Sequence, residues 1–302
     1  MSNPKPISKS VILALIDLAQ SQAKIFLASD RSALSDLFSE CQTENQIMML
    51  KELLSKFNYL TSSELQEGAK EIALAISQKW ALNPKDTLIV AISDGDRTDG
   101  SQYLVKSVET ALARAGTRFD VRNQLGPAFH EVQNKKTKYK NIVILDDFIG
   151  TGGKVSGVIE RLQKYITHQK IYIASLAGMN FGIDHISKSC GCDIFSFISY
   201  KKSISDEFLE PKRSAYISAM IELEERIIPP STYPRNSREK CYMLGYGESE
   251  ALYFLEGFSV PNNVFPIFWK NQYCDRADYL PDSSGKPFKK TRHARNPILT
   301  RA

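Results

Sequence analysis

The sequence predicts an α/β fold, in which helices flank a parallel β-sheet. Short apolar runs alternate with helix-length stretches from residue 87 to residue 200, and this alternation is typical of parallel sheets. The first run is apolar throughout residues 88–92, as expected of a strand that is buried on both faces. In residues 8–80, by contrast, apolar side chains recur at helical spacing. We therefore expect a helical N-terminal region ahead of the sheet.

The composition is that of an ordinary globular protein. The chain has 302 residues, of which 42% are hydrophobic and 24% charged, so it can bury a sizeable core and is neither disordered nor a disulfide-rich scaffold. The apolar run at residues 11–15 soon meets Asp17 and is too short for a membrane span. The five cysteines and four histidines lack paired metal-binding spacing. We expect reduced thiols, a cytoplasmic location and no contact with a membrane.

The N-terminal region, residues 1–84, is expected to form a cap of several helices. Ser8 and Ser63 are candidate N-cap residues, because a serine hydroxyl accepts hydrogen bonds from the free amides of a first helical turn. Asn83 and Pro84 are expected to end the last of these helices.

The core, residues 85–230, contains the predicted sheet. We expect strands at residues 87–92, 119–125, 141–145, 170–176 and 193–199, and helices at residues 101–115, 153–165, 183–189 and 205–228. In parallel sheets, ligands bind at the carboxyl ends of the strands. The loops that follow Ile92 and Leu145 are therefore where we expect a site.

The C-terminal part divides into a mixed segment, residues 231–284, and a basic tail, residues 285–302. Strands are expected at residues 242–246 and 251–255. The tail holds six basic residues and no acidic ones, and without it the net charge falls from +5 to 5 − 6 = −1. Such a tail is expected to be solvated, and the alternative is a local contact with nucleic acid.

One segment combines a strand, two acids, a glycine-rich loop and a helix start. The largely apolar residues 141–145 are followed by Asp146 and Asp147, and residues 150–153 read Gly-Thr-Gly-Gly. Backbone amides at the start of a helix bind phosphate, because unpaired donors meet the positive end of the helix dipole there. Two adjacent carboxylates accept hydrogen bonds from neighbouring sugar hydroxyls, or contact a divalent ion shared with a polyphosphate. The segment therefore predicts a site that binds a diol and a phosphate together.

Two common nucleotide-binding motifs do not match this segment. The Walker pattern of NTPases has glycine where Phe148 stands, and it has serine or threonine after the lysine, whereas Val155 follows Lys154. The dinucleotide-binding pattern requires a third glycine, also at position 155. Both interpretations therefore fail.

The order of strand, acids and loop resembles the phosphoribosyl pyrophosphate (PRPP) motif of the type I phosphoribosyltransferases. That motif has an apolar strand, an acid pair, two variable residues and a Thr-Gly-Gly-Thr loop, and this chain differs at Lys154, where threonine is usual. The resemblance implies a type I phosphoribosyltransferase-like fold, with Asp146 and Asp147 as the catalytic pair at the ribose hydroxyls. It also implies that the following residues bind PRPP: Phe148, Ile149, Gly150, Thr151, Gly152, Gly153 and Lys154. A lysine holds phosphate as a point charge.

The same family has a pyrophosphate loop after its first strand, and that position is acidic here. The corresponding residues are Ser93, Asp94, Gly95, Asp96 and Arg97. The resemblance implies Mg²⁺ at Asp94, Asp96 and Asp147, and a contact of Arg97 with the leaving pyrophosphate. The alternative for this loop is a solvated turn. Lysines within residues 135–138 lie where the family carries a flexible loop, and solvated charge is their alternative.

Over nearly its whole length the chain resembles the phosphoribosyltransferase-like effectors of bacterial conflict systems, including those encoded beside retron reverse transcriptases. Residues 245–247 and 261–269 complete this resemblance. It implies an antiphage role, a complex with a reverse transcriptase and noncoding RNA or DNA, and a homodimer as in many type I relatives. The C-terminal segment would act as a hood that binds the acceptor. Its candidate acceptor residues are Asn262, Asn263, Phe268 and Trp269, and core packing is the alternative for the two aromatic residues.

The leading hypothesis is an enzyme that binds Mg²⁺ and PRPP and transfers or releases the 5-phosphoribosyl group, with pyrophosphate as the leaving group. Such a displacement depends on stabilising a ribose cation and a polyanionic leaving group. Two alternatives stay open. One is a non-catalytic module that senses PRPP or a nucleotide, and the other is a nucleic-acid-associated effector subunit anchored by the basic tail.

Overall fold

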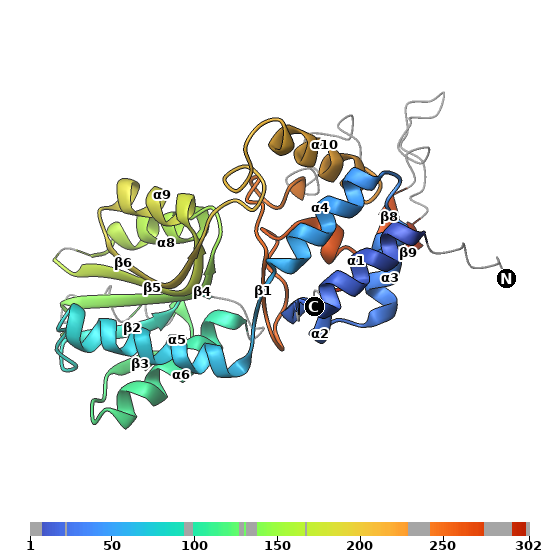
Figure 1. The fold of residues 1–302 in the computed structure, drawn as a ribbon. Coiled ribbons are helices and arrows are strands. Elements are labelled where there is room, and N and C mark those ends of the chain that lie inside the picture. Colours follow the sequence, from blue (N-terminus) through green and yellow to red (C-terminus); the bar gives the residue numbers. More distant parts are fainter. Residues whose placement is uncertain are drawn as a thin grey trace. The chain divides into compact units, whose positions relative to one another are not determined.

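The chain folds into two compact units. The computed structural model describes residues 8–21, 23–93, 99–126, 130, 138–166, 168–228, 242–274 and 292–299 (Figure 1). The first unit comprises residues 1–59, 202–254 and 260–302, and the second comprises residues 60–201 and 255–259. This division differs from the four segments expected from the sequence. The reason is that the helix at residues 62–74 packs against the sheet and so joins the second unit.

The second unit contains a five-stranded parallel sheet, which confirms the predicted fold class. Its strands are β2 (Thr87–Ala91), β3 (Asp120–Arg122), β4 (Asn141–Ile149), β5 (Lys170–Met179) and β6 (Asp193–Tyr200). They lie in the order β3-β2-β4-β5-β6. All residues of β2 are buried, as expected of a strand covered on both faces.

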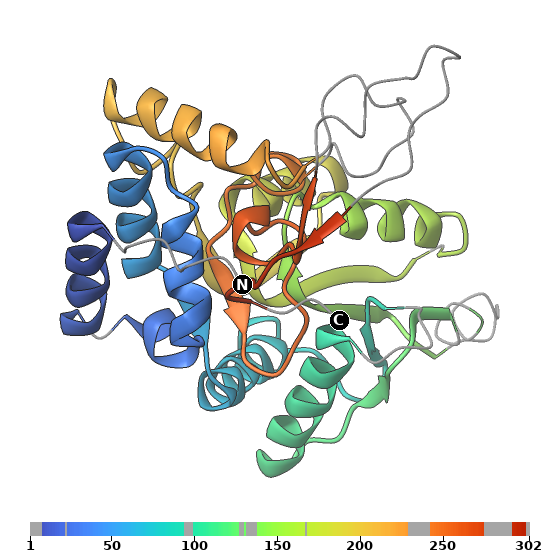
Figure 2. The same ribbon diagram turned by 90° about the vertical axis from the view of Figure 1, so that its right-hand side faces the viewer.

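Helices cover both faces of this sheet. The helices are α5 (Ser62–Leu74), α6 (Gly100–Arg114), α8 (Gly153–Gln163) and α9 (Asn180–Cys190). In Figure 1, α5 and α6 lie on one face and α8 and α9 on the other, and Figure 2 gives a second view of the same layers. On the α8 side, Ile144 and Ile173 of the sheet pack in one cluster with Val158 and Ile159. The predicted alternation of strand and helix therefore produces three layers.

The start of α5 differs from the sequence prediction. Ser63 was expected as the N-cap, but Thr61 holds that position. The Thr61 hydroxyl accepts a hydrogen bond from the Glu64 amide, and the Glu64 carboxylate accepts one from the Thr61 amide. This reciprocal pair satisfies two free amides at once, which a serine two residues later does not. A short π-helix, η1 (Ala75–Lys79), follows α5.

The first unit is largely helical. Its helices are α1 (Lys9–Gln20), α2 (Lys24–Ala28), α3 (Arg31–Ser39), α4 (Glu44–Ser55) and α10 (Lys212–Glu224). α1 is capped as predicted, because the Ser8 hydroxyl accepts a hydrogen bond from the Val11 amide. α10 begins later than the expected residue 205, since Glu250 accepts hydrogen bonds from the amides of Ile204 and Ser205 and holds them outside the helix. Within the described residues, no helix is both long and apolar enough to cross a membrane.

The strand predicted at residues 242–246 is wrong. These residues form turns, with Leu244 at φ 56° and Gly245 at φ 81°. Gly245 is required because a Cβ atom there would lie 2.0 Å from the Asn263 carbonyl oxygen. Buried Glu224 accepts a hydrogen bond from the Leu244 amide and holds this turn in place. The strand expected at residues 251–255 is present as β7 (Tyr253–Leu255), paired with β1 (Asn58–Leu60).

The described part of the expected basic tail is folded, so the prediction of a solvated segment is wrong for residues 292–299. β9 (Arg292–Ala294) pairs antiparallel with β8 (Gln272–Cys274), and the buried residues Ile298 and Leu299 follow it. Arg295 is 7% exposed and is therefore a core residue. The physical reason for its burial is a partner, Glu40, that is distant in the sequence.

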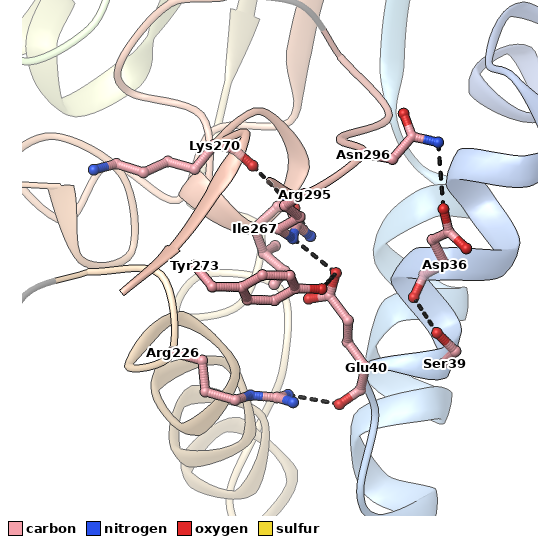
Figure 3. Close-up of polar contacts among 9 residues, drawn as sticks. All are labelled: Asp36, Ser39, Glu40, Arg226, Ile267, Lys270, Tyr273, Arg295 and Asn296. Atoms are coloured by element: carbon pink, nitrogen blue, oxygen red, sulfur yellow. Dashed lines mark hydrogen bonds and ion pairs between the residues drawn. The ribbon is translucent and has the colours of Figure 1, made fainter. Parts of the chain in front are cut away.

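The buried ion pair between Arg295 and Glu40 is shown in Figure 3. The Arg295 Nε lies 2.7 Å from the Glu40 Oε1. The other guanidinium nitrogens donate to the backbone oxygens of Ile267 and Lys270, and the Tyr273 hydroxyl donates to Glu40. Each guanidinium nitrogen of Arg295 thus has a hydrogen-bond partner, and the pair joins the C-terminal segment to the end of α3.

Candidate active site

The candidate site lies at the carboxyl edge of the sheet, where the strand order reverses. β2 and β4 are neighbours in the sheet. The connection from β2 leads to β3 on one side of this pair, whereas the connection from β4 leads to β5 on the other side. In α/β proteins, ligands bind outside the carboxyl ends of the strands at such a switch point. The segments that follow these two strand ends are the two loops chosen from the sequence.

β4 is longer than predicted. Its apolar pattern stops at Leu145, but the strand continues to Ile149, with Asp146 in register with Ser175 of β5. The two acids therefore belong to the strand, which holds their backbone in place. Ser175 is fully buried and its hydroxyl donates to the Ser196 hydroxyl at 2.9 Å. Sequence reasoning missed Ser175 because a single serine in an apolar strand carries no motif.

Asp146 is buried beside the cation of Lys154. Its side chain is 4% exposed, and its Oδ1 lies 3.3 Å from the Nζ of Lys154 in the first turn of α8. Burial raises the pKa of Asp146 to about 7, and the positive charge of Lys154 limits that increase. Lys154 stands where the PRPP motif usually has its last threonine, and it contacts Asp146, the first acid of the pair.

Asp147 faces the start of α6 on the opposite side of β4. A Cβ atom at Gly100 would lie 2.3 Å from the Asp147 Oδ2, so any larger residue there would displace the Asp147 side chain. Burial raises the pKa of Asp147, and the neighbouring charge of Asp99 adds to the increase. The Asp99 carboxylate caps α6 by accepting hydrogen bonds from the Ser101 and Gln102 amides. Asp99 therefore has a structural role, and Gly100 is a site residue that the sequence alone did not reveal.

The loop between β4 and α8 presents backbone amides to the site. Gly152 occupies the N-cap position with φ 82°, a conformation that favours glycine. Gly152 has no side chain to cap α8, and no acid lies in the first turn of this helix. The Thr151 hydroxyl accepts a long hydrogen bond of 3.4 Å from the Gly153 amide. This is the arrangement of donors that binds a phosphate group.

Two of the predicted PRPP-binding residues lie in the interior. Phe148 is 8% exposed and Ile149 is 1% exposed, because the strand continues through them and their side chains pack in the core. Their side chains therefore do not present a surface to a ligand. The remaining loop residues, Gly150 to Lys154, are the ones at the start of α8.

We expect Gly182→Ala to weaken phosphate binding by about tenfold or more. A Cβ atom at Gly182 in α9 would lie 2.0 Å from the Gly150 carbonyl oxygen, so the loop must move. Gly157→Ala in α8 is the matched control, because its Cβ meets no atom within 4 Å, and it should stabilise the fold by up to about 1 kcal/mol. Calorimetric titration of both variants with PRPP measures the effect. Equal affinities would show that the loop geometry is unimportant for binding.

We expect the stability cost of Asp146 to depend on pH. The ordinary pKa of 3.8 applies to the unfolded chain and a pKa of about 7 to the folded one, so stability falls as the pH rises between these values. Asp146→Asn should therefore raise the free energy of unfolding by roughly 2–4 kcal/mol at pH 8, and the gain should shrink towards pH 5. Urea unfolding at several pH values tests this. A gain that is constant with pH would contradict the proposed burial effect.

Part of the predicted pyrophosphate and metal site lies outside the described residues. These positions are Asp94, Gly95, Asp96 and Arg97, and also residues 135–137. Ser93 is described and is buried at the end of β2. Among the described residues, no three histidine, cysteine or acidic side chains gather as a metal site. Asp147 is therefore the expected metal ligand whose position is known.

The predicted acceptor residues belong to the first unit and are mostly buried. Phe268 is fully buried and packs edge-on against Phe57, and the Trp269 Nε1 donates to the Val264 carbonyl oxygen. Asn263 is also buried and donates through its amide to the Tyr246 carbonyl oxygen. Stacking of a base on either aromatic ring is therefore the wrong interpretation.

Asn262 is the partly exposed member of this acceptor set, and its backbone oxygen accepts a hydrogen bond from the Tyr246 amide. In a sequence, a run of aromatic and amide residues looks the same whether the segment is buried in a core or forms a surface that binds a base. Only the packing distinguishes the two.

A comparison with protein families identifies the chain. The model of the PRTase-CE family, whose name abbreviates phosphoribosyltransferase, matches residues 36–277. The chain belongs to the PRTase-CE family. The matched residues of the PRTase-CE protein include β2 and β4, the acid pair at the end of β4 and the glycine-rich loop that follows it. No curated protein matches the sequence.

Several solved structures are similar to the PRTase-CE protein at low sequence identity. The hypoxanthine-guanine phosphoribosyltransferase of Schistosoma mansoni in complex with IMP is 15% identical, with 45% of this chain and 62% of that chain covered and a TM-score of 0.30. This chain thus spans less than two thirds of that enzyme. The orotate phosphoribosyltransferase of Aeropyrum pernix is 13% identical, with 44% and 70% covered and a TM-score of 0.29. The Helicobacter pylori xanthine-guanine-hypoxanthine enzyme is 13% identical, with 48% and 84% covered and a TM-score of 0.30.

Proposed function

We propose that this PRTase-CE protein binds Mg²⁺ and PRPP and transfers or releases the 5-phosphoribosyl group, with pyrophosphate as the leaving group. The observation that carries the proposal is the end of β4. Two adjacent carboxylates at a strand-order switch point lead directly into a left-handed glycine and the open amides of α8. Family membership supports this assignment.

Each part of the site has a separate role in this proposal. Asp146 and Asp147 accept hydrogen bonds from the ribose hydroxyls and stabilise the positive charge that develops on the ribose ring. The amides of residues 151–154 hold the 5′-phosphate at the helix start. The Lys154 ammonium lies 3.3 Å from Asp146, at the start of the same helix, and would contact the phosphate as a point charge.

The residues present suit a magnesium ion that is shared with the substrate. Mg²⁺ is usually held in proteins by one or two carboxylates together with substrate phosphates, rather than by a complete protein cage. Asp147 supplies such a carboxylate and is half-buried, and Asp94 and Asp96 would add to it. When bound, the ion neutralises the charge of the departing pyrophosphate.

One observation favours a second candidate function, in which the protein senses PRPP without turning it over. Lys154 already pairs with Asp146, so the carboxylate that would stabilise the ribose cation has an internal cation partner. A pocket of this kind binds a ribose phosphate but provides less stabilisation for developing positive charge.

We further propose an antiphage setting, in which the protein is the toxic effector of a retron-type system in the cytoplasm. Its partners would be a reverse transcriptase and a noncoding RNA or DNA. The support is the resemblance of the chain to such effectors. The alternative is that the basic tail anchors nucleic acid. One of its six basic residues, Arg295, is not accessible for such a contact, because it is buried against Glu40.

Calorimetric titration with PRPP, with and without Mg²⁺, tests the proposed function. A pyrophosphate-release assay on the same sample follows it. Binding that requires Mg²⁺ and leads to release supports the transferase, and titration with Mg²⁺ alone provides the control. Binding without release selects the sensor. An absence of binding under all these conditions would overturn both assignments.

A further inference from the structure

The two edges of the five-stranded sheet differ in how well they are protected. β3 forms one edge and is only 3 residues long, with the charged residues Asp120 and Arg122 at its ends. Short, charged edge strands discourage pairing with another chain. β6 forms the other edge, is 8 residues long and contains no proline, glycine or basic residue. Every residue of β6 is half-buried or exposed. An edge strand with these properties is a template for another strand.

The sequence of β6 is self-complementary. Residues 194–198 read Ile-Phe-Ser-Phe-Ile and are the same in both directions. In an antiparallel pair with a two-fold axis at Ser196, Ile194 lies opposite the partner's Ile198, and Phe195 opposite the partner's Phe197. Residues directly opposite each other on the same face are the pairs that stabilise a sheet, and aromatic pairs are among the strongest. A second copy of this strand is therefore its best-matched partner.

The two faces of β6 would extend two existing layers. Ile194 packs against the core cluster on the α8 side of the sheet. On the opposite face, Phe197 lies over Gly68 of α5, and the Lys79 Nζ lies 5.6 Å from the centre of the Phe195 ring. The pairing would thus join isoleucine to isoleucine on one face and phenylalanine to phenylalanine on the other.

We propose that β6 pairs antiparallel with β6 of a second copy of this chain, about a two-fold axis at Ser196. The result is one continuous sheet through two second units. Ser196 suits the axis, because its hydroxyl accepts from Ser175 and donates to the Ile198 carbonyl oxygen, so both of its hydrogen bonds stay within one chain. β5 separates β6 from β4, so the acid pair is not part of this interface. The inference is independent of the proposed function.

Cysteine cross-linking of the full-length protein tests the axis. Ser196→Cys places two thiols opposite each other across the axis, whereas Ser199→Cys is the matched control, since residue 199 lies opposite the partner's Asp193. Under a mild oxidant, the Ser196→Cys protein should form a disulfide-linked dimer, and the wild type and Ser199→Cys should not. Mass spectrometry of the linked peptide identifies the bond and excludes the native cysteines.

Sedimentation of the wild type over a wide range of concentrations provides the second measurement. We expect a dimer that Phe195→Lys weakens by about tenfold or more, because lysine on an edge strand opposes pairing. Circular dichroism shows whether that variant is folded, and Ser196→Cys changes a single atom and tests the axis without this risk. A monomeric wild type would overturn the proposal. So would a dimer in which Ser196→Cys forms no cross-link.

Discussion

Replacing Asp146 and Asp147 together by asparagine is expected to abolish PRPP-dependent pyrophosphate release, with a loss of roughly 10³-fold or more. Asparagine keeps the size of each side chain and removes the negative charge that would stabilise a ribose cation. The fold should be retained, because Asp146 is buried, Asp147 is half-buried, and burial raises the pKa of each carboxyl group. A pyrophosphate-release assay measures the loss, and circular dichroism confirms the fold.

The matched control for this double variant is Glu160→Gln. Glu160 is an exposed acid on α8, the same helix that opens the site, so it changes the charge nearby without entering the site. We expect its release rate to stay within about twofold of the wild type. Unchanged release in the Asp146→Asn, Asp147→Asn protein would remove the assignment of the acid pair. A PRPP titration of the same protein separates lost binding from lost chemistry.

Replacing Arg295 by methionine is expected to lower the free energy of unfolding by about 3–5 kcal/mol. Methionine fills much of the space of the arginine stem, but it leaves the Glu40 carboxylate buried without its cation. It also removes the hydrogen bonds to the backbone oxygens of Ile267 and Lys270. Residues 292–299 should then separate from the first unit. Urea unfolding, followed by circular dichroism, measures the change.

Two controls isolate the burial of this ion pair. Arg213→Met removes an exposed ion pair with Glu210 and should cost less than about 1 kcal/mol. Adding Glu40→Gln to Arg295→Met removes the stranded charge, so the double variant should be more stable than Arg295→Met alone. Equal costs for Arg295→Met and Arg213→Met would contradict the structural role of the buried pair.

Local patterns in the sequence predict most of the sheet and the centre of the site. The strands at residues 87–92 and 141–145 follow from continuous apolar runs, because a strand covered on both faces excludes polar side chains from its length. The acid pair and glycine loop follow from one contiguous motif at a helix start. The Ser8 cap is also local, since a cap acts within the next turn. Each of these features depends on residues that are close in the chain.

Features that depend on distant residues were not predicted, and several expectations about them are wrong. The turn at residues 242–246 exists because Gly245 lies against the Asn263 backbone and Glu224 holds Leu244. Trp269 is buried, and its indole Nε1 donates a hydrogen bond to the Val264 carbonyl oxygen in the core. The sequence of residues 265–269 is equally compatible with an exposed surface that binds a base.

Arg295 was expected in a solvated tail, yet its partner Glu40 lies 255 residues earlier in the chain. A contact between segments so far apart leaves no periodicity in either segment. A charged residue is buried only where a residue of opposite charge packs beside it, and the tertiary structure determines which residues pack together.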